Sequence, residues 1–336
     1  MNTEKQRILV SILNWNSTPD TLACLQPLTA PAVDGIDCLV LDNGSTVDTT
    51  EQIRLAYPGV EVLRTPVNLG FTGGHNLVFK LALQRGYGSV LILNNDCSIA
   101  PDAIRRLQQV LDQHGDVAAV SPLIYTSSAT PRPQAVAGWL DWRRQRSVYP
   151  SEPGVAAPEG LPTHVLGTAL LLRCAALRQI GLLDERYFAY YEDNDLSARI
   201  AQHGYRALYC DSATALHRSR DISEYSAMAL YLSARNSWLF WGTHTPMPYR
   251  RGMRRRLLSQ SLYNLALLKK KNAAPVLLDA VVDGCWDALR GRYGAPSQPR
   301  GSSPWLLRRL ATIAPYLVSQ LLEAPLTTLR RKLSPR

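Results

Sequence analysis

The first hundred residues alternate between short apolar runs and segments whose apolar residues recur at helical spacing. Residues 7–13 form an apolar run with β-branched members, which is typical of a buried strand. Leu22, Leu25 and Leu28 follow a Ser/Thr/Asp start, and this spacing predicts a helix over 18–28. The same reasoning predicts strands at 38–41, 60–64 and 89–93 and helices at 48–56 and 74–84. Alternating strands and helices indicate an α/β protein whose mostly parallel sheet has helices on both faces.

The pattern changes at residues 126–162, where Ser, Pro and Gly cluster around Trp139 and Trp142. Such a stretch predicts a long loop, a linker or an irregular hairpin. Regular structure is expected to resume with a strand at 164–173 and helices at 175–181 and 194–203, the last of them ended by Gly204.

Beyond Trp241 the sequence becomes basic and helical, and two prolines mark a boundary near residues 243–248. We therefore predict one domain over 1–242 and a basic helical region over 243–336.

Composition is that of a globular protein: 46% of the 336 residues are hydrophobic and 19% are charged. The six cysteines form no C-x-x-C pair, so we interpret them as reduced thiols of a cytoplasmic protein. The chain starts without the pattern of a signal peptide, and no apolar run reaches the roughly 18 residues of a membrane span.

The net charge of +10 is unevenly distributed along the chain. Residues 1–240 hold 20 Lys and Arg against 23 Asp and Glu, whereas residues 241–336 hold 17 against 4. The whole positive excess therefore lies in the last 96 residues. That region either contacts something anionic or exposes a solvated charged face, which is the more common use of such a run.

Asp42 follows the second predicted strand, at the edge of the sheet where open α/β folds bind ligands. A carboxylate there can accept a hydrogen bond from a ribose hydroxyl or a pyrimidine N–H. The sequence Asp-Asn-Gly-Ser is equally a strong Asx-turn, so the two interpretations stay open.

Residues 68–76, Asn-Leu-Gly-Phe-Thr-Gly-Gly-His-Asn, form a glycine-rich loop that leads into a helix. Such loops let backbone N–H groups approach phosphates at a helix N-terminus. The alternative is a tight structural connection.

Asp96 follows the all-apolar strand at 89–93 in the sequence Asn94-Asn95-Asp96. A carboxylate here can hold Mg²⁺ or Mn²⁺, which prefer oxygen ligands and bridge diphosphate oxygens. One carboxylate is few for a metal, and His217 is the candidate second ligand, although a lone histidine is more often structural.

Three acids, Glu192, Asp193 and Asp195, stand at the start of a predicted helix and beside several aromatic residues. Asp193 or Asn194 would make a good N-cap, which is the structural alternative. A cap accounts for one acid and not for three. Aromatic walls raise the pKa of a carboxyl, whereas a helix N-terminus lowers it.

Together these motifs resemble the family 2 glycosyltransferases of the GT-A fold, in particular their bacterial rhamnosyltransferase-like branch. The matching stretches occur in the family's order: VSILNWN (10–16), LVLDNGSTVDT (39–49), NLGFTGGHN (68–76), ILNNDCSIAPDAI (92–104), residues 167–205 and YLSARNSW (231–238).

The resemblance implies roles for particular residues. Asp193 corresponds to the catalytic base, with Glu192 beside it as a second candidate. Asp96 corresponds to the retained acid of the D-x-D metal motif, in which Asn94 replaces the first Asp, and His217 to a histidine on the metal side. Asp42 corresponds to the contact with the nucleotide base, and Arg235 is placed near phosphate. The implied donor site comprises Asn14, Asn16, Asp42, Asn43, Asn68, Gly70, Asn76, Asn95, Asp96 and Arg235.

The implied reaction is inverting transfer of a sugar from a nucleoside diphosphate donor to a hydroxyl of a saccharide or lipid-linked glycan. The domain at 1–242 is then the catalytic one, in which residues 1–100 are expected to bind mainly the nucleotide and residues 101–242 to supply mainly acceptor binding and catalysis. The resemblance favours dTDP-L-rhamnose as donor, with UDP-sugars second. A nicotinamide-dependent dehydrogenase would need G-x-G-x-x-G after the first strand, where this chain has Asn-Trp-Asn-Ser-Thr-Pro. A nucleic-acid-binding protein would account for the basic tail but leave the acidic motifs without a role, so no nucleic acid is expected as partner.

The basic tail carries apolar residues at helical spacing. This pattern predicts a helix that lies on an anionic membrane surface, namely the inner face of the cytoplasmic membrane. The alternative is that these residues pack onto the catalytic domain. Pro315 would kink the helix in either case. The later stripe is Trp305, Leu306, Leu310, Ile313, Leu317 and Leu321, with Arg308 and Arg309 off it. The earlier one is Leu257, Leu258, Leu262 and Leu265, between the basic runs 254–256 and 269–271.

Overall fold

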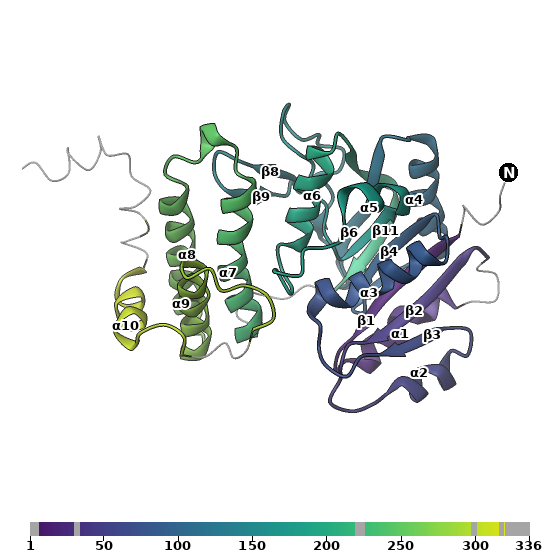
Figure 1. Cartoon of the computed structure of the whole chain (residues 1–336), viewed down its shortest axis with the longest axis horizontal. Helices are drawn as coiled ribbons and strands as arrows, with labels where there is room; N and C mark the ends of the chain where they lie inside the picture. Colours follow the sequence, from purple (N-terminus) through teal and green to yellow (C-terminus); the bar gives the residue numbers. More distant parts are fainter. Residues whose placement is uncertain (1–6, 30–33, 219–225, 297–300, 316–318, 320–336) are drawn as a thin grey trace, which may run out of the picture. The chain divides into compact units, whose positions relative to one another are not determined.

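The computed structural model describes residues 7–29, 34–218, 226–296, 301–315 and 319. Contacts divide the chain into two compact units, each of which is described by itself (Figure 1). The first unit comprises Met1–Leu140, Ser147–Phe188 and Glu192–Ser219. The second comprises Asp141–Arg146, Ala189–Tyr191 and Arg220–Arg336.

A nine-stranded sheet forms the centre of the first unit, counted over the described residues. Its strands follow the order β3-β2-β1-β4-β10-β6-β11-β5, and β7 pairs with β6. The first four strands in this order are parallel, β10 is antiparallel to both its neighbours, and β6 and β11 are again parallel. The prediction of a mostly parallel α/β sheet is confirmed. The strands are β1 (Ile8–Asn14), β2 (Ile36–Asp42), β3 (Glu61–Arg64), β4 (Ser89–Asn94), β5 (Cys97–Ile99), β6 (Val117–Thr126), β7 (Pro133–Ala135), β10 (Ala169–Arg173) and β11 (Arg206–His217).

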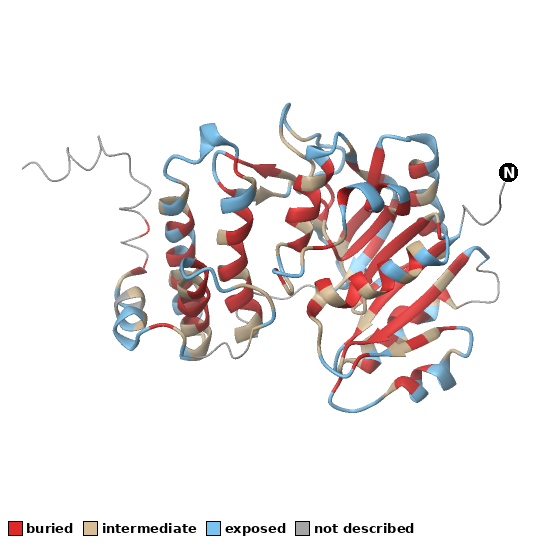
Figure 2. Ribbon diagram, in the orientation of Figure 1, coloured by how far each residue is buried: buried red, intermediate tan, exposed pale blue. Residues whose placement is uncertain are grey.

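Helices cover both faces of the sheet because its strands are apolar on both sides. Along β1, Ile8, Val10 and Ile12 join one buried cluster and Leu9 joins the other, as the two-residue period of a strand requires. The core strands are accordingly red in Figure 2. The first cluster is covered by α1 (Thr18–Leu25) with its 3₁₀ extension Gln26–Leu28, α2 (Thr50–Ala56) and α4 (Pro101–Gln113). The second is covered by α3 (Gly70–Gln84), α5 (Cys174–Ile180) and α6 (Glu192–Gln202).

The segment 126–162 contains an irregular hairpin, one of the three alternatives that its composition left open. Strands β8 (Trp139–Asp141) and β9 (Arg146–Val148) pair with each other as a separate two-stranded sheet. Asp141 closes the turn between them, since its Oδ1 accepts from the backbone N–H groups of Arg143 and Arg144, both at 3.0 Å.

The second unit is helical. Its elements are α7 (Ala227–His244), a 3₁₀ turn at Met247–Tyr249, α8 (Met253–Lys270), α9 (Pro275–Leu289) and α10 (Trp305–Ile313). Ser226 caps α7 by accepting from the N–H of Ala229. Gly284 allows α9 to lie close to α7, because a Cβ there would lie 2.3 Å from the carbonyl oxygen of Tyr231. Contacts thus place α7 with the helices after it, whereas the functional boundary at residue 242 stays a prediction.

Two expectations about the whole chain can be compared with the structure. All six cysteines are free, and five of them are buried. Among the described residues, none of the helices combines the length and the apolar character needed to span a bilayer.

Candidate active site

The carboxyl ends of β1, β2 and β4 meet at one edge of the sheet. The register pairs Asn14 with Asp42 and Leu13 with Asn94, so these three strands end side by side. The polar residues that follow each strand are thereby brought together, as the sequence predicted from the general behaviour of parallel sheets.

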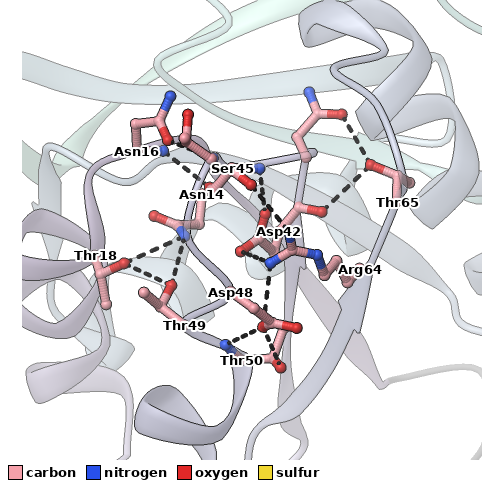
Figure 3. Close-up of polar contacts among 12 residues, drawn as sticks. Asn14, Asn16, Thr18, Asp42, Ser45, Asp48, Thr49, Thr50, Arg64 and Thr65 are labelled. Atoms are coloured by element: carbon pink, nitrogen blue, oxygen red, sulfur yellow. Dashed lines mark hydrogen bonds and ion pairs between the residues drawn. The ribbon is translucent and has the colours of Figure 1, made fainter.

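Asp42 is fully buried at this edge, where it forms the Asx-turn, and its contact with a nucleotide stays a prediction (Figure 3). Its Oδ1 accepts from the N–H of Ser45 at 2.8 Å, which is the Asx-turn. Its Oδ2 lies 3.5 Å from Nη1 of Arg64 and has no hydrogen bond among the described residues. A buried carboxylate oxygen in this state is costly unless a donor reaches it, and an N–H of a nucleotide base is such a donor.

Asn14 and Asn16 fasten the end of β1 to the loops around it (Figure 3). Asn14 is buried, and its Oδ1 accepts from Oγ1 of Thr21 at 3.0 Å. Asn16 adopts a left-handed φ of 53° and accepts from the N–H of Thr46 at 2.8 Å. Asparagine tolerates this backbone conformation better than most residues. Both side chains therefore shape this edge of the sheet. Their direct contact with the sugar-nucleotide donor stays a prediction.

The glycine-rich loop is held by Asn43. Asn43 donates to the carbonyl of Gly70 at 2.9 Å and to Oδ1 of Asn68 at 3.2 Å, and it accepts from the N–H of Leu69 at 3.0 Å. Helix α3 begins at Gly70 rather than at Gly74. Gly70 has a φ of 73°, and a Cβ there would lie 2.4 Å from the carbonyl oxygen of Phe188, so only glycine fits. The structural interpretation of this loop is thus observed, and phosphate binding stays a prediction.

Asn76 has a structural use that the sequence did not indicate. Both N–H groups of its buried amide are engaged, with the carbonyl of Leu183 at 2.9 Å and with Oε1 of Glu185 at 3.0 Å. Its Oδ1 accepts from the N–H of Leu183 at 2.9 Å. Asn76 thus ties α3 to the segment before α6, and its predicted contact with the sugar-nucleotide donor stays a prediction.

Asp96 and His217 are adjacent in space although 121 positions separate them in the chain. Antiparallel pairing of β5 with β11 brings them together, with Nε2 of His217 3.2 Å from Oδ1 of Asp96. Nδ1 of His217 lies 2.9 Å from Oε1 of Gln134. If this nitrogen donates to Gln134, Nε2 presents a lone pair toward a carboxylate oxygen, and two facing acceptors call for a cation between them.

These two residues, which we call the metal pair, fit a divalent cation held together with phosphate oxygens and water. Among the described residues, His, Cys, Asp and Glu form no group of three or more that could hold a metal. Asn95 precedes Asp96, and its amide donates to Oγ1 of Thr21 at 3.1 Å, which fixes the turn that carries the pair.

The three acids lie inside the first turn of α6, which begins at Glu192. The structural alternative, in which Asp193 or Asn194 caps this helix, is therefore not observed. Oδ1 of Asp193 accepts from the N–H of Asn194 at 2.8 Å, and its Oδ2 accepts from the N–H of Gly167 at 3.3 Å. Asp195 forms an ion pair with Arg199 at 2.7 Å one turn later, so it has a structural partner.

Glu192 and Asp193 have opposite electrostatic environments. Burial raises the pKa of the Asp193 carboxyl, but His164 and the two backbone N–H groups outweigh burial, and that pKa lies below its usual value. Burial and then repulsion by Asp193 raise the pKa of Glu192 well above its usual value. The side chain of Asp193 is 16% exposed, whereas Glu192 is buried. Neighbouring carboxyls with separated pKa values are suited to different chemical tasks, and here Asp193 is the ionised one.

Sequence reasoning missed His164, whose Nε2 lies 3.8 Å from Oδ1 of Asp193. No spacing rule connects a histidine before one strand with an acid that follows 29 residues later, so the only available signal was a polar residue at the start of an apolar run.

Arg235 belongs to the second unit and is buried there. Its Nη1 donates to the carbonyl of Gly294 at 2.9 Å and its Nε to Oδ1 of Asn236 at 3.0 Å. Asn236 in turn donates to the carbonyls of Ala189 and Tyr190, both at 2.8 Å. The structure thus gives the Arg-Asn pair a role inside this unit, and its predicted place near phosphate stays a prediction.

Comparison with known proteins connects this site with a family. Residues 10–181 match the sequence profile described as glycosyl transferase family 2. Over 210 residues the chain is 30% identical to an N-acetylglucosaminyl-diphospho-decaprenol L-rhamnosyltransferase of Mycobacterium tuberculosis, and this match covers 54% of the chain and 66% of that protein.

The fold is similar to solved glycosyltransferase structures. S. aureus TarS 1–349 in complex with UDP-GlcNAc matches with a TM-score of 0.57 at 16% identity, over 98% of this chain and 93% of that one. The mannosyltransferase PcManGT of Pyrobaculum calidifontis, in complex with GDP-Man and Mn²⁺, matches with a TM-score of 0.52 at 16% identity, over 94% and 86%. These likenesses confirm the predicted GT-A fold. The chain therefore belongs to glycosyl transferase family 2.

Proposed function

We propose that this enzyme transfers a hexose, favoured as L-rhamnose from dTDP-L-rhamnose, to a hydroxyl of a saccharide or lipid-linked glycan with inversion at the anomeric carbon. The observation that carries the proposal is Asp193, a partly exposed carboxylate at the start of α6 that accepts two backbone hydrogen bonds and whose pKa lies below its usual value. An ionised carboxylate that a substrate can reach is what a general base requires.

In this reaction Asp193 accepts the proton of the acceptor hydroxyl as the oxygen attacks the anomeric carbon. The C–O bond to the nucleoside diphosphate breaks as the new glycosidic bond forms, and the diphosphate leaves with the bonding electron pair. The hydrogen bonds from Gly167 and Asn194 hold both oxygens of Asp193, so the carboxylate does not have to reorient. Glu192 is buried and its pKa is raised by burial and by Asp193, so it is the weaker candidate for the base.

The donor is expected to bind along the shared edge of β1, β2 and β4. Asp42 would accept from the nucleotide base through its unsatisfied Oδ2. The metal pair would hold Mg²⁺ or Mn²⁺, which supplies positive charge to the departing diphosphate. Asn94, in place of a second carboxylate, leaves the pair with one negative charge.

Support for rhamnose comes from the mycobacterial relative, whose name specifies L-rhamnose and a diphospho-lipid acceptor. The similar solved structures contain UDP-GlcNAc and GDP-Man, so a UDP-sugar is the alternative donor. A screen of purified protein against dTDP-L-rhamnose, UDP-sugars and GDP-mannose, with and without Mn²⁺, measures nucleoside diphosphate release. Turnover restricted to a donor other than dTDP-L-rhamnose would refute the rhamnose assignment, and no turnover with any donor would refute the site.

The acceptor proposal includes an anionic membrane surface, and α10 supports it. Trp305, Leu306 and Ile313 are 63%, 59% and 62% exposed, and at 100° per residue they share one side of the helix. Arg309 is not off this stripe as predicted, because its guanidinium lies over the Trp305 ring at 5.3 Å. An apolar side chain with a covering cation suits the boundary between lipid headgroups and acyl chains.

The earlier stripe is largely inaccessible to a membrane. Leu257, Leu262 and Leu265 of α8 are buried, while Leu258 is exposed, and packing of this stripe onto the catalytic domain stays a prediction. Leu317 and Leu321 lie outside the described residues, and so does the side chain of Leu310.

Vesicle co-sedimentation of the full chain tests the membrane proposal. The double variant Trp305→Ser, Ile313→Ser should bind phosphatidylglycerol vesicles about tenfold more weakly than the wild type, since each side chain loses apolar burial. Leu55→Ser is the control, because Leu55 is 76% exposed on α2 in the other unit. Equal recovery of the double variant and the wild type would refute a role for α10 at the membrane.

A further inference from the structure

His164 is almost completely buried between two groups that can hydrogen-bond. It is 1% exposed, and its Nδ1 lies 2.6 Å from the hydroxyl of Tyr149. Its Nε2 faces Oδ1 of Asp193 at 3.8 Å and has no hydrogen bond among the described residues. A buried ring nitrogen in this state is costly, so its orientation toward the carboxylate calls for an explanation.

The surrounding backbone fixes the position of this imidazole. The N–H of His164 donates to the carbonyl of Gly138 at 3.0 Å, and its carbonyl accepts from the hydroxyl of Tyr209 at 2.8 Å. A Cβ at Gly138 would lie 2.7 Å from the carbonyl oxygen of His164 and 3.1 Å from Cδ1 of Tyr149. The glycine therefore permits the close packing that sets both rings.

We propose that Tyr149 and His164 are positioning residues for Asp193, which hold its carboxylate ionised and correctly oriented without touching the substrate. This inference rests on the proposed role of Asp193 as the base. It also gives a function to part of the segment 126–162, which carries Tyr149 directly after β9.

The positioning role requires one order of hydrogen-bond donors. A Tyr149 O–H that donates to Nδ1 of His164 would leave the ring proton on Nε2, where it faces the carboxylate of Asp193. At 3.8 Å the N–H and the carboxylate interact as a dipole and a charge, because the separation exceeds a hydrogen bond. Such contacts are often long without substrate and tighten when it binds.

The other groups that face Asp193 do not compensate for the imidazole. Glu192 on the same helix repels the charge of Asp193 when it is ionised, and burial raises the pKa of Tyr209 on β11, which is a neutral phenol. The backbone N–H groups of Gly167 and Asn194 complete the surroundings. Loss of the ring should therefore raise the pH at which Asp193 ionises.

The test compares His164→Gln and Tyr149→Phe with two matched controls. His203→Gln and Tyr205→Phe make the same chemical changes at surface sites, where His203 contacts the carbonyl of Arg199 and Tyr205 donates to Gln179. With the donor selected by the screen at saturation, kcat is measured from pH 5 to pH 9. Donor affinity is measured by calorimetry and folding by thermal unfolding. Long-range ¹H–¹⁵N spectra report which ring nitrogen of His164 carries the proton.

We expect His164→Gln to lower kcat by about 10- to 100-fold, the range seen when a residue that orients a metal ligand is removed. We also expect the acidic limb of the profile to move to higher pH. Tyr149→Phe should have a smaller effect in the same direction and shift the ring proton away from Nε2. Donor affinity should not change, and the controls should match the wild type.

Two failures are distinguishable. Wild-type turnover in Asp193→Asn would overturn the base and this inference with it. Two outcomes would overturn the positioning role alone. In the first, Asp193→Asn is inactive but the acidic limb does not move in folded Tyr149→Phe and His164→Gln. In the second, His164 of the wild type carries its proton on Nδ1.

Discussion

Asp193→Asn should lower turnover while it leaves donor affinity and folding largely intact, because the exchange is nearly isosteric. Two backbone N–H groups each use a different oxygen of this carboxylate. An amide has only one acceptor oxygen, so one of these bonds is lost at a cost of about 1 kcal/mol. Loss of the negative charge at the start of α6 adds about 0.3–1 kcal/mol. We therefore expect the free energy of unfolding to fall by about 1–2 kcal/mol, which leaves the protein folded.

The effect on catalysis should be larger. Removal of a general base typically costs about 10²–10⁴-fold, which is about 3–5 kcal/mol in the barrier. Turnover is measured by nucleoside diphosphate release, donor affinity by calorimetry and stability by urea unfolding. Asp116→Asn is the control, since Asp116 is an exposed ion-pair partner of Arg206. Turnover within about tenfold of the wild type, less than the typical effect of losing a general base, would refute the assignment and favour Glu192.

Three further predictions follow from particular contacts. Gln134→Ala should raise the Mn²⁺ concentration for half-maximal activity about 10- to 100-fold; an unchanged Mn²⁺ titration would show that the metal is held elsewhere. Gly70→Ala should lower the free energy of unfolding by about 2–5 kcal/mol, from left-handed strain and a methyl against the carbonyl of Phe188. Gly86→Ala, with a φ of 75° and nothing within 4 Å, should show the strain alone, and equal losses in urea unfolding would contradict the clash. Glu192→Gln should stabilise the protein relative to the wild type, increasingly as pH rises above 4.5. Burial and the neighbouring carboxylate raise the pKa of Glu192 in the folded protein, so the unfolded chain ionises first. The prediction would be refuted if the difference in thermal unfolding temperature between variant and wild type were the same at pH 4 and pH 8.

The edge of the sheet was predictable from the sequence because strand ends follow from local pattern. The runs ending at Asn14, Asp42 and Asn94 are apolar and short, and parallel strands must end together. The pairing of Asp96 with His217 was anticipated from chemistry, and the antiparallel pairing of β5 with β11 supplied the geometry. Helix starts were harder to predict. The helices that begin at Gly70 and Glu192 were predicted to begin at 74 and 194, because the residues before them are not typical N-caps.

Contacts that depend on tertiary folding could not be predicted. Phe188, Tyr190 and Tyr191 all have positive φ, at 64°, 67° and 74°, in the turn before α6. Bulky residues rarely adopt this conformation, so no local rule would place three of them there. Strain of this kind, at about 1–3 kcal/mol per residue, persists only where the surrounding structure holds it. The hydrogen bonds from Asn236 to the carbonyls of Ala189 and Tyr190 are such a constraint.

The two carboxyls at the start of α6 show why residue type and spacing alone do not assign a catalytic role. Glu192 and Asp193 are adjacent, share one helix N-terminus and feel the same dipole, so their sequence context hardly distinguishes them. What separates them is the direction in which each side chain points. Asp193 meets an imidazole and two N–H groups, whereas Oε2 of Glu192 is buried without a hydrogen bond among the described residues. The opposite pKa shifts follow from this difference, and so does the choice of base, which rests on His164 and Gly167 rather than on the acidic motif itself.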